Sequence, residues 1–261
     1  MLEKQINTFK KYRFLLVELV KKGIKLKYRR SYLGILWTLL EPLLTTCVLT
    51  LVFGTFFGRD DKTFPVYILT GRLLYSFFSA GTKAAMKSIR QHAGMIKKVY
   101  VPKYIYPLSS VLFNFIIFVI SLVVLVGATL VFGVYPNKWV ITSLLPLVML
   151  LLLTLGVGMI LSTMSVFFRD LEYLWDVALM LIMYTCAIFY KTKTMEKTGH
   201  AWIFKLNPLY AIIKIFRDAI YGRSMFADPY WVIMPAVVSV LSVLIGVALF
   251  KKHQDNFILH I

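Results

Sequence analysis

The residues of this sequence that could carry chemistry are few and scattered. No stretch matches the Gly-x-x-x-x-Gly-Lys-Ser/Thr loop that holds nucleotide phosphates, and no Ser/His/Asp set is suggested. No His, Cys, Asp and Glu residues have metal-ligand spacing. The four histidines fall in predicted connectors and tails, at His92, His200, His253 and His260. The sequence therefore predicts a chain that is not an enzyme by itself and binds no cofactor or metal.

Two charged residues, Glu41 and Arg72, interrupt long apolar stretches. If these stretches are membrane helices, Glu41 lies about 12 Å from the cytoplasmic end of one and Arg72 about 12 Å from the outer end of the next. In a hydrocarbon core of about 30 Å, their depths then differ by roughly 6 Å. A charge facing lipid is costly, so we expect Arg72 to face the protein interior. Cys47 and Cys186 also fall in apolar stretches and are interpreted as small apolar residues.

The composition indicates an integral membrane protein. The chain has 261 residues, of which 59% are hydrophobic and only 16% are charged, and its mean hydropathy is +0.74. A soluble domain would carry about 45–50% apolar and about 25% charged residues. The net charge of +18 does not indicate nucleic acid, because the basic residues flank apolar stretches, where they set topology and meet anionic lipids.

Six apolar stretches are long enough to cross a bilayer, which needs roughly 20 residues. We predict an all-α permease domain over residues 33–261, with spans at 33–57, 64–82, 105–132, 139–168, 173–190 and 230–250. Residues 1–32 precede it and predict a basic amphipathic helix on the membrane surface, because apolar residues recur there at helical spacing. A solvated basic tail is the alternative.

Basic residues in the connectors predict the orientation. The N-terminal segment has ten Lys and Arg residues and the 83–104 connector has six, whereas 58–63 has two and 133–138 has one. Both termini and residues 83–104 are therefore expected in the cytoplasm. Residues 191–228 carry seven basic residues and conflict with this rule, since six spans place them outside. Their most apolar part, 208–221, would reach only about 21 Å as a helix, so we predict an external or dipping helix instead.

Several short motifs resemble those of one transporter family. Residues 26–42 resemble the opening segment of type-2 ABC export permeases, in the branch that exports lipid-linked polysaccharides such as O-antigen, capsule-like glycans and teichoic acids. Further matches follow in order: Phe64-Pro65-x-Tyr67-x-x-x-Gly71, Ile96-Lys97-Lys98-Val99-Tyr100-Val101-Pro102, Phe168-Arg169-Asp170, and Asn207-Pro208-Leu209 with Phe216-Arg217-Asp218. The resemblance covers nearly the whole chain, and the motifs gain specificity from their common order.

The resemblance implies roles for two connectors. Residues 83–104 would contain a coupling helix that docks on a separate ATPase, with contacts at Ile96, Lys97, Lys98, Val99, Tyr100 and Pro102. The alternative is a basic loop that only sets topology. Residues 191–228 would form an external gate of two short helices, with the named positions Asn207, Pro208, Phe216, Arg217 and Asp218. An ordinary external loop is the alternative, although Asn207 is a good N-cap and Pro208 suits a first helical position.

The resemblance also implies a path for a glycan. Sugars stack their C–H faces on aromatic rings, and the candidates on the first two spans are Phe53, Tyr67, Tyr75, Phe77 and Phe78. Interfacial belts and lipid-facing positions are the alternative for each ring. Arg29 and Arg30 could attract a lipid diphosphate at the cytoplasmic side, or only anchor the helix. Arg72 departs from the family, which usually has an apolar residue there. It either pairs with Glu41 or faces the pore and meets phosphate or an acidic glycan.

Taken with the resemblance, these features predict one subunit of a larger machine. We expect a multi-pass protein of the bacterial cytoplasmic membrane that pairs with a second copy and two ABC ATPase subunits. The ATPases would bind ATP and Mg²⁺, and the cargo would be a lipid-linked polysaccharide; no nucleic-acid partner is expected. A type-2 permease for a drug or simple lipid, and a stand-alone secondary transporter or channel, are the alternatives.

Overall fold

Helices account for all regular secondary structure in the part of the chain that is described. The computed structural model describes residues 2–29, 31–57, 61–99, 101–135, 137–190 and 201–260, and no strand occurs among them. The long helices are α1 (Leu2–Lys27), α2 (Trp37–Phe57), α3 (Phe64–Gln91), α5 (Ile105–Val131), α6 (Leu144–Phe167), α7 (Leu171–Thr185), α10 (Pro208–Ile220) and α11 (Tyr230–His253). The short ones are η1 (Gly34–Leu36), α4 (Ala93–Ile96), η2 (Lys138–Ser143), α9 (Ala201–Leu206), η3 (Gln254–Asn256) and α12 (Phe257–His260). The predicted all-α class is confirmed.

Four helical segments are long and apolar enough to cross a membrane. Within the described residues they are Gly34–Gly54, Ile105–Val131, Lys138–Phe167 and Tyr230–His260. They agree with four of the six predicted spans. The other two predicted spans, 64–82 and 173–190, fall on α3 and on α7 with the chain after it, and the helix ends differ from the span ends. α3 does not end at residue 82 but continues to Gln91, and the helix of the predicted fifth span ends at Thr185 rather than 190.

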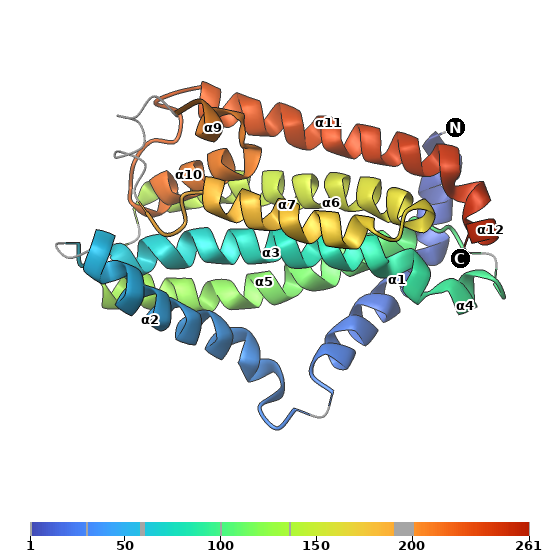
Figure 1. Cartoon of the computed structure of the whole chain (residues 1–261), viewed down its shortest axis with the longest axis horizontal. Helices are drawn as coiled ribbons and strands as arrows, with labels where there is room; N and C mark the ends of the chain where they lie inside the picture. The colour runs from blue at the N-terminus through green and yellow to red at the C-terminus, as the bar shows by residue number, and fades with distance from the viewer. Residues whose placement is uncertain are drawn as a thin grey trace.

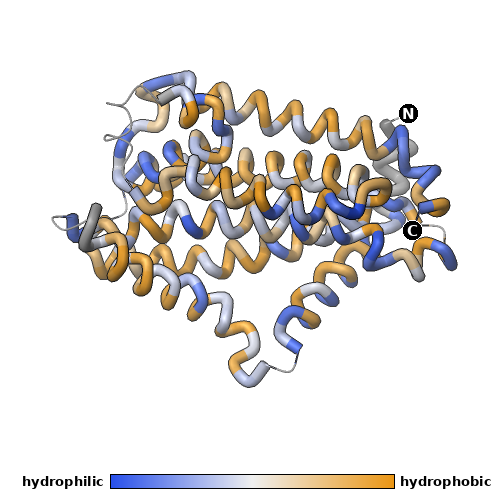
Figure 2. Tube along the Cα trace, viewed as in Figure 1, coloured by the Kyte–Doolittle hydropathy of each residue, from blue (hydrophilic) through white to orange (hydrophobic). Residues whose placement is uncertain are grey.

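The two ends of the bundle differ in what they carry (Figure 1). Both termini lie at the same end as α4 and α12, whereas α9 and α10 lie at the opposite end. α2 approaches α3 at that second end and diverges from the bundle toward its own N-terminus. Hydrophilic segments gather at both ends, and the long helices between them are mostly hydrophobic (Figure 2). This pattern fits a bundle whose long axis crosses a membrane.

The centre of the bundle is built on α3, which packs against α5 and α6, and on the pairing of α6 with α11. Small residues allow the second pair to approach closely, as is common in membrane helices. A Cβ atom at Gly156 of α6 would lie 2.4 Å from the carbonyl carbon of Ser242 on α11. A Cβ at Gly246 would lie 2.7 Å from the carbonyl oxygen of Gly156. Any larger residue at either position would push the helices apart.

The outer faces of the bundle are strongly apolar. Leu51 on α2, Val123 on α5 and Leu244 on α11 are 75%, 63% and 60% exposed, respectively. A soluble monomer rarely shows contiguous apolar surface on this scale. Lipid or a second protein must cover these faces.

Helix α1 is folded onto the bundle. Leu16 and Leu19 are buried in the cluster that joins α1 to the ends of α3 and α5, Val20 is buried as well, and Phe14 on another face is 74% exposed. A Cβ at Gly23 would lie 2.9 Å from the ring of Phe113 on α5. Over the described side chains, α1 is therefore amphipathic and packed, not a solvated tail.

Candidate functional site

The connector between α3 and α5 contains only one turn of helix. Ile96 ends α4, is 7% exposed and belongs to the same buried cluster as Leu16 and Ile105. Lys97, Lys98 and Val99 follow it and are exposed. Val101 and Pro102 are not helical, because a proline disfavours a helical backbone at the residue before it. The regular helix of this connector is therefore Ala93–Ile96, followed by an exposed turn, and the predicted coupling role of residues 96–103 stays a prediction.

The remaining connector residues anchor this turn to the C-terminal tail. Pro102 is half-buried, and Tyr100 lies outside the described residues. The Lys103 amine donates to the carbonyl oxygen of Gln254 and lies 5.8 Å from the ring centre of Phe257. Phe257 is fully buried. The tail therefore holds one side of the connector in place and leaves the other side, at Lys97–Val99, accessible.

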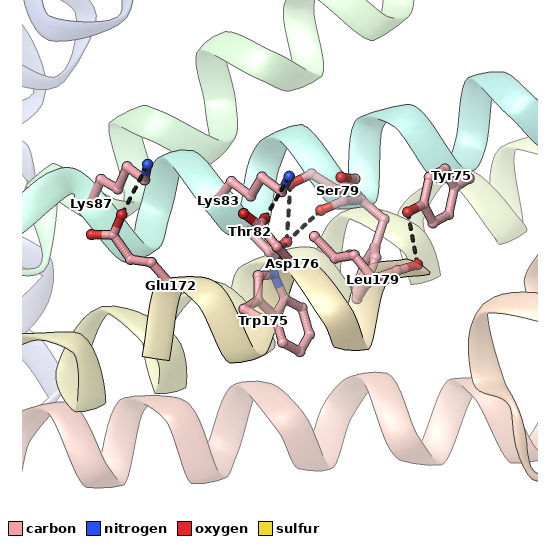
Figure 3. A network of polar contacts seen from close by, with 10 residues as sticks. Tyr75, Ser79, Thr82, Lys83, Lys87, Glu172, Trp175, Asp176 and Leu179 are labelled. Carbon is pink, nitrogen blue, oxygen red and sulfur yellow. Dashed lines mark hydrogen bonds and ion pairs between the residues drawn. The ribbon is translucent and has the colours of Figure 1, made fainter. Parts of the chain in front are cut away.

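A ladder of polar contacts joins α3 to α7 (Figure 3). The Lys83 amine lies 2.7 Å from the Asp176 carboxylate, and the Lys87 amine lies 3.0 Å from Glu172. Arg90 pairs with the same Glu172 carboxylate. Figure 3 shows Lys83 and Lys87 reaching from one helix toward Asp176 and Glu172 on the adjacent helix, at successive turns of each.

Further hydrogen bonds between α3 and α7 continue the ladder. Further along, the indole N–H of Trp175 donates to Thr82 at 3.1 Å, and the Tyr75 hydroxyl donates to the carbonyl oxygen of Leu179 at 2.8 Å. Leu179 is the one buried side chain among residues 171–185. α7 is therefore held by polar contacts on one face and exposes apolar side chains on the other. The ladder was not predicted from the sequence, although the lysines at 83 and 87 and the acids at 172 and 176 each have i,i+4 spacing.

The chain just after α7, at the end of the bundle opposite the termini, is buried but not helical. Cys186, Ala187, Ile188 and Phe189 are buried but not helical, and Ala187 has a φ of +46°. Non-helical backbone at membrane depth needs hydrogen-bond partners from the protein. The Tyr67 hydroxyl supplies one, since it lies 3.0 Å from the Ala187 carbonyl oxygen and 2.9 Å from that of Tyr190.

Arg217 on α10 supplies the other partners. Its guanidinium donates to the carbonyl oxygens of Ala187 (3.1 Å) and Tyr67 (3.0 Å) and to the Thr70 hydroxyl (3.3 Å). Its central carbon also lies 3.5 Å from the centre of the Tyr67 ring. A Cβ at Gly71 would lie 2.5 Å from the guanidinium, so only glycine leaves room for it. The motif at residues 64–71 and the motif at residues 216–218, which are far apart in the sequence, thus meet at Arg217.

The cap of α10 is formed as predicted. The side-chain oxygen Oδ1 of Asn207 accepts from the backbone N–H groups of Leu209 (3.0 Å) and Tyr210 (3.2 Å), and Pro208 is the first helical residue. The Asn207 amide also donates to the Thr185 hydroxyl at 2.9 Å. Phe216 is buried beside the bundle, so this segment is a packed helix rather than an ordinary loop.

The charges at the end of α10 are compensated locally. Asp218 pairs with Lys214 at 3.5 Å, and the Lys214 amine lies 4.7 Å from the centre of the Trp231 ring on α11. α10 is therefore joined to α3, α7 and α11 at the end of the bundle opposite the termini.

A cavity of about 330 Å³ opens between α2, α3 and α5, beside the end of α1. Its charged lining residues are Lys27, Glu41, Arg72 and Lys83. Within the described part of the chain, Arg72 and Glu41 line the same cavity and form no ion pair with each other. Glu41 instead interacts electrostatically with the Lys27 amine. Desolvation lowers the pKa of the Lys27 amine, and the Glu41 carboxylate raises it.

The predicted aromatic residues take different places. Tyr75 and Phe77 line this cavity, and Phe77 stacks on Phe118 with ring centres 5.1 Å apart. Phe78 lines a second, apolar cavity of about 420 Å³ between α7, α11 and α10. Phe53 stacks on Phe189 at 5.0 Å.

Tyr67 contacts other parts of the protein, and one of the two predicted head-group arginines, Arg29, lies among the described residues. The Tyr67 hydroxyl and ring are engaged by backbone carbonyls and by Arg217, so Tyr67 links α3 to α10 and to the chain after α7. Arg29 is exposed just beyond the end of α1, and Arg30 lies outside the described residues.

Among the described residues, no three His, Cys, Asp and Glu side chains are grouped so that they could hold a metal ion. The geometry described above is that of a membrane bundle with an accessible basic turn at one end and a packed, capped helix at the other.

Comparison with known proteins identifies the family. The family model described as ABC-2 type transporter matches residues 15–221, and the chain belongs to this family of membrane permeases, which carry no ATPase site of their own. Similar proteins include the O-antigen export system permease protein RfbA of Myxococcus xanthus, which is 29% identical over 94% of this chain and 95% of its own length. The protein of the same name from Klebsiella pneumoniae is 28% identical over 93% of each chain. The polysialic acid transport protein KpsM of Escherichia coli is 23% identical over 90% of this chain and 91% of its own length.

Proposed function

We propose that this chain is the permease subunit of an ATP-driven exporter that moves a lipid-linked polysaccharide across the bacterial inner membrane. The observation that carries the proposal is similarity over nearly the full length to permeases named for O-antigen and polysialic acid transport. The relatives also include a protein named capsule polysaccharide export inner-membrane protein CtrC, from Neisseria meningitidis. The cargo would be a glycan on a polyprenyl diphosphate, of the O-antigen, capsule or teichoic-acid type.

The pore would form between two copies of the chain, with six spans in each. α3 has 28 residues, or about 42 Å of helix, which exceeds a hydrocarbon core of about 30 Å. α7 has 15 residues, or about 22 Å, and the buried chain after Thr185 extends it. Since α7 exposes most of its apolar side chains, it is a candidate for contact with lipid or with the second copy. Both termini and the turn at Lys97–Val99 would face the cytoplasm.

Two ATPase subunits, which would bind ATP and Mg²⁺, would dock on the exposed turn. A connected route then leads from this turn to the external gate. α3 leads from the connector to the polar ladder, the ladder holds α7, and the end of α7 is hydrogen-bonded to Asn207 and Arg217 of the gate segment. Movement at the turn would reach the gate through these contacts, and the aromatic residues Tyr75 and Phe77 would be available to a glycan in the cavity.

The proposal is tested by co-purification and transport. The chain is purified with its ATPase partner, and ATP-dependent transfer of a polyprenyl-diphosphate glycan is followed in inverted vesicles. Val99→Asp is expected to lower the amount of retained ATPase at least tenfold, or about 1.4 kcal/mol of binding, because it places a charge on the docking turn. It should leave the melting temperature unchanged, since Val99 is 55% exposed.

The matched control is Leu259→Asp, at an 80% exposed position near the same end of the molecule. It should keep the ATPase bound. A wild-type chain that recruits no ATPase and transports under an ion gradient alone would refute the proposal in favour of a stand-alone carrier. A complex that hydrolyses ATP in response to a drug or simple lipid, and not to the glycan, would refute the cargo.

A further inference from the structure

Arg72 has an uncompensated charge in the middle of the bundle. By helical rise, it lies about 12 Å from the outer end of α3. In the part of the chain that the structure describes, its guanidinium forms no ion pair and no hydrogen bond, although it offers five N–H donors. A charged side chain at this depth is expensive unless something satisfies it. Among the described residues, Arg72 therefore lacks the partner that its position requires.

Arg217 shows what a satisfied arginine looks like in the same bundle. Its guanidinium donates to two backbone carbonyls and one hydroxyl, and it covers the ring of Tyr67. Arg72 is only one residue beyond Gly71, which makes room for Arg217, yet it faces the cavity between α2, α3 and α5 instead. Arg217 is thus hydrogen-bonded within the protein, whereas Arg72 faces a cavity.

Arg72 carries the excess positive charge among the residues that line the cavity. Lys83 is paired with Asp176 at 2.7 Å, and Lys27 is influenced by Glu41. Three basic residues and one acidic residue line the cavity, so one positive charge remains after these two assignments. The Ser76 hydroxyl lies in the same lining and forms no hydrogen bond with the described residues. A guanidinium and a hydroxyl together suit an oxyanion, because the planar guanidinium can bind two oxygens at once.

The position of the cavity limits where the anion can come from. Phosphates of resident lipids lie outside the hydrocarbon core, whereas Arg72 lies well inside it. Arg72 and Lys83 are eleven residues apart, or about 16 Å along α3, and both line the cavity. Lys27, at the end of α1, lines it as well. The cavity thus extends from the end of the surface helix α1 to mid-depth, and an anion at Arg72 must be carried by a molecule that crosses the membrane.

We propose that Arg72 and its cavity form an anion-binding site for the cargo in transit, which holds either a phosphate of the lipid diphosphate or a carboxylate of an acidic sugar. The cavity volume of about 330 Å³ is at the small end of ligand pockets, so it fits a diphosphate or a single sugar unit rather than a chain. The site sets a preference for anionic cargo. This inference rests on the proposed export function.

The test measures binding to the purified permease–ATPase complex in nanodiscs of neutral lipid. The probes are undecaprenyl diphosphate, undecaprenol as the same chain without phosphates, and oligogalacturonate as an acidic sugar. Arg72→Leu should weaken binding of one anionic probe at least tenfold, and Arg72→Lys should weaken it less. Neither should change binding of undecaprenol. Arg169→Gln, at an exposed arginine in the turn before α7, is the matched control and should bind all three probes as the wild type does.

The probe that responds identifies the source of the anion. Loss of undecaprenyl diphosphate binding assigns the site to the lipid diphosphate, and loss of oligogalacturonate binding assigns it to acidic sugars. Without ligand, Arg72→Leu should melt at or above the wild-type temperature, because it removes a charge that has no protein partner. Equal binding of both anionic probes by wild type and Arg72→Leu would overturn the inference, and so would a lower melting temperature of the ligand-free variant. Failure of the wild type to recruit an ATPase would instead count against the proposed function.

Discussion

Replacing Arg217 by Met should release the gate segment while leaving the rest of the bundle folded. Met keeps the length of the side chain and removes the charge and all three hydrogen bonds. Hydrogen bonds from charged groups contribute about 1.5–3 kcal/mol each, and a desolvated cation over an aromatic ring adds about 2 kcal/mol. The desolvation of a buried charge, which costs several kcal/mol, is relieved in the variant. The Ala187 carbonyl also keeps the Tyr67 hydroxyl as a donor. The net loss of local stability should therefore be only about 2 kcal/mol.

The rate at which Cys186 is labelled measures this loss of local stability, because Cys186 lies in the non-helical segment after α7. Cys186 is fully buried one residue before Ala187, so it reacts with a membrane-impermeant maleimide only when this segment opens. Cys47 is changed to Ser in the background to remove the other thiol. A loss of about 2 kcal/mol should raise the labelling rate about 30-fold if opening and closing are fast. Labelling should come from the outer side of the membrane.

The matched control is Arg223→Met, since Arg223 is an exposed arginine that follows α10. It should label at the wild-type rate. Arg217→Lys should fall between the two, because one ammonium cannot reproduce the planar set of three contacts. If Arg217→Met labels no faster than Arg223→Met, then the hydrogen bonds at Ala187 do not hold the gate segment, and the argument for its anchoring is refuted.

Three other perturbations probe different parts of the molecule. Gly156→Ala should destabilise the fold by about 1–3 kcal/mol in a thermal melt, because its Cβ would collide with backbone of α11, whereas Gly127→Ala, with open space around it, should be neutral. Glu172→Gln removes the partner of two ladder cations that are partly exposed, so it should cost less than about 1 kcal/mol of stability yet lower the glycan transported per ATP; an unchanged ratio would refute the coupling role. Phe257→Ala should cost about 3–5 kcal/mol if the tail is part of the core, and a melt unchanged by it would show the tail to be dispensable.

The sequence predicted the elements whose signals are local. Long apolar runs predicted α5, α6 and α11, and the pair Asn207-Pro208 predicted where α10 begins, because capping depends on neighbouring residues alone. The end of α3 was not predicted. Basic residues after Thr82 resemble a connector when taken alone, but they continue the helix and meet acids on α7, ninety residues later in the chain.

The candidate site was predictable in outline and not in its contacts. The segment after Thr185 has no Gly or Pro to end a helix, so nothing local marks the end of α7; the partners that stabilise this segment come from α3 and α10. Aromatic residue types likewise do not distinguish a pore from a core. Tyr67 and Phe77 have the same sequence signal, yet one anchors a helix and the other lines a cavity.

The excess of basic residues in the segment 191–228 also has a structural explanation, at least for the described part. The positive-inside rule counts charges that interact with lipid and solvent while the chain inserts. Arg217 is 6% exposed and donates to the Ala187 carbonyl just after α7 and to the Tyr67 carbonyl on α3, and Lys214 pairs with Asp218 beside the Trp231 ring. Both cations therefore have partners within the protein. Two of the seven basic residues thus stabilise the gate helix, and their presence on the side opposite the termini is compatible with the predicted orientation.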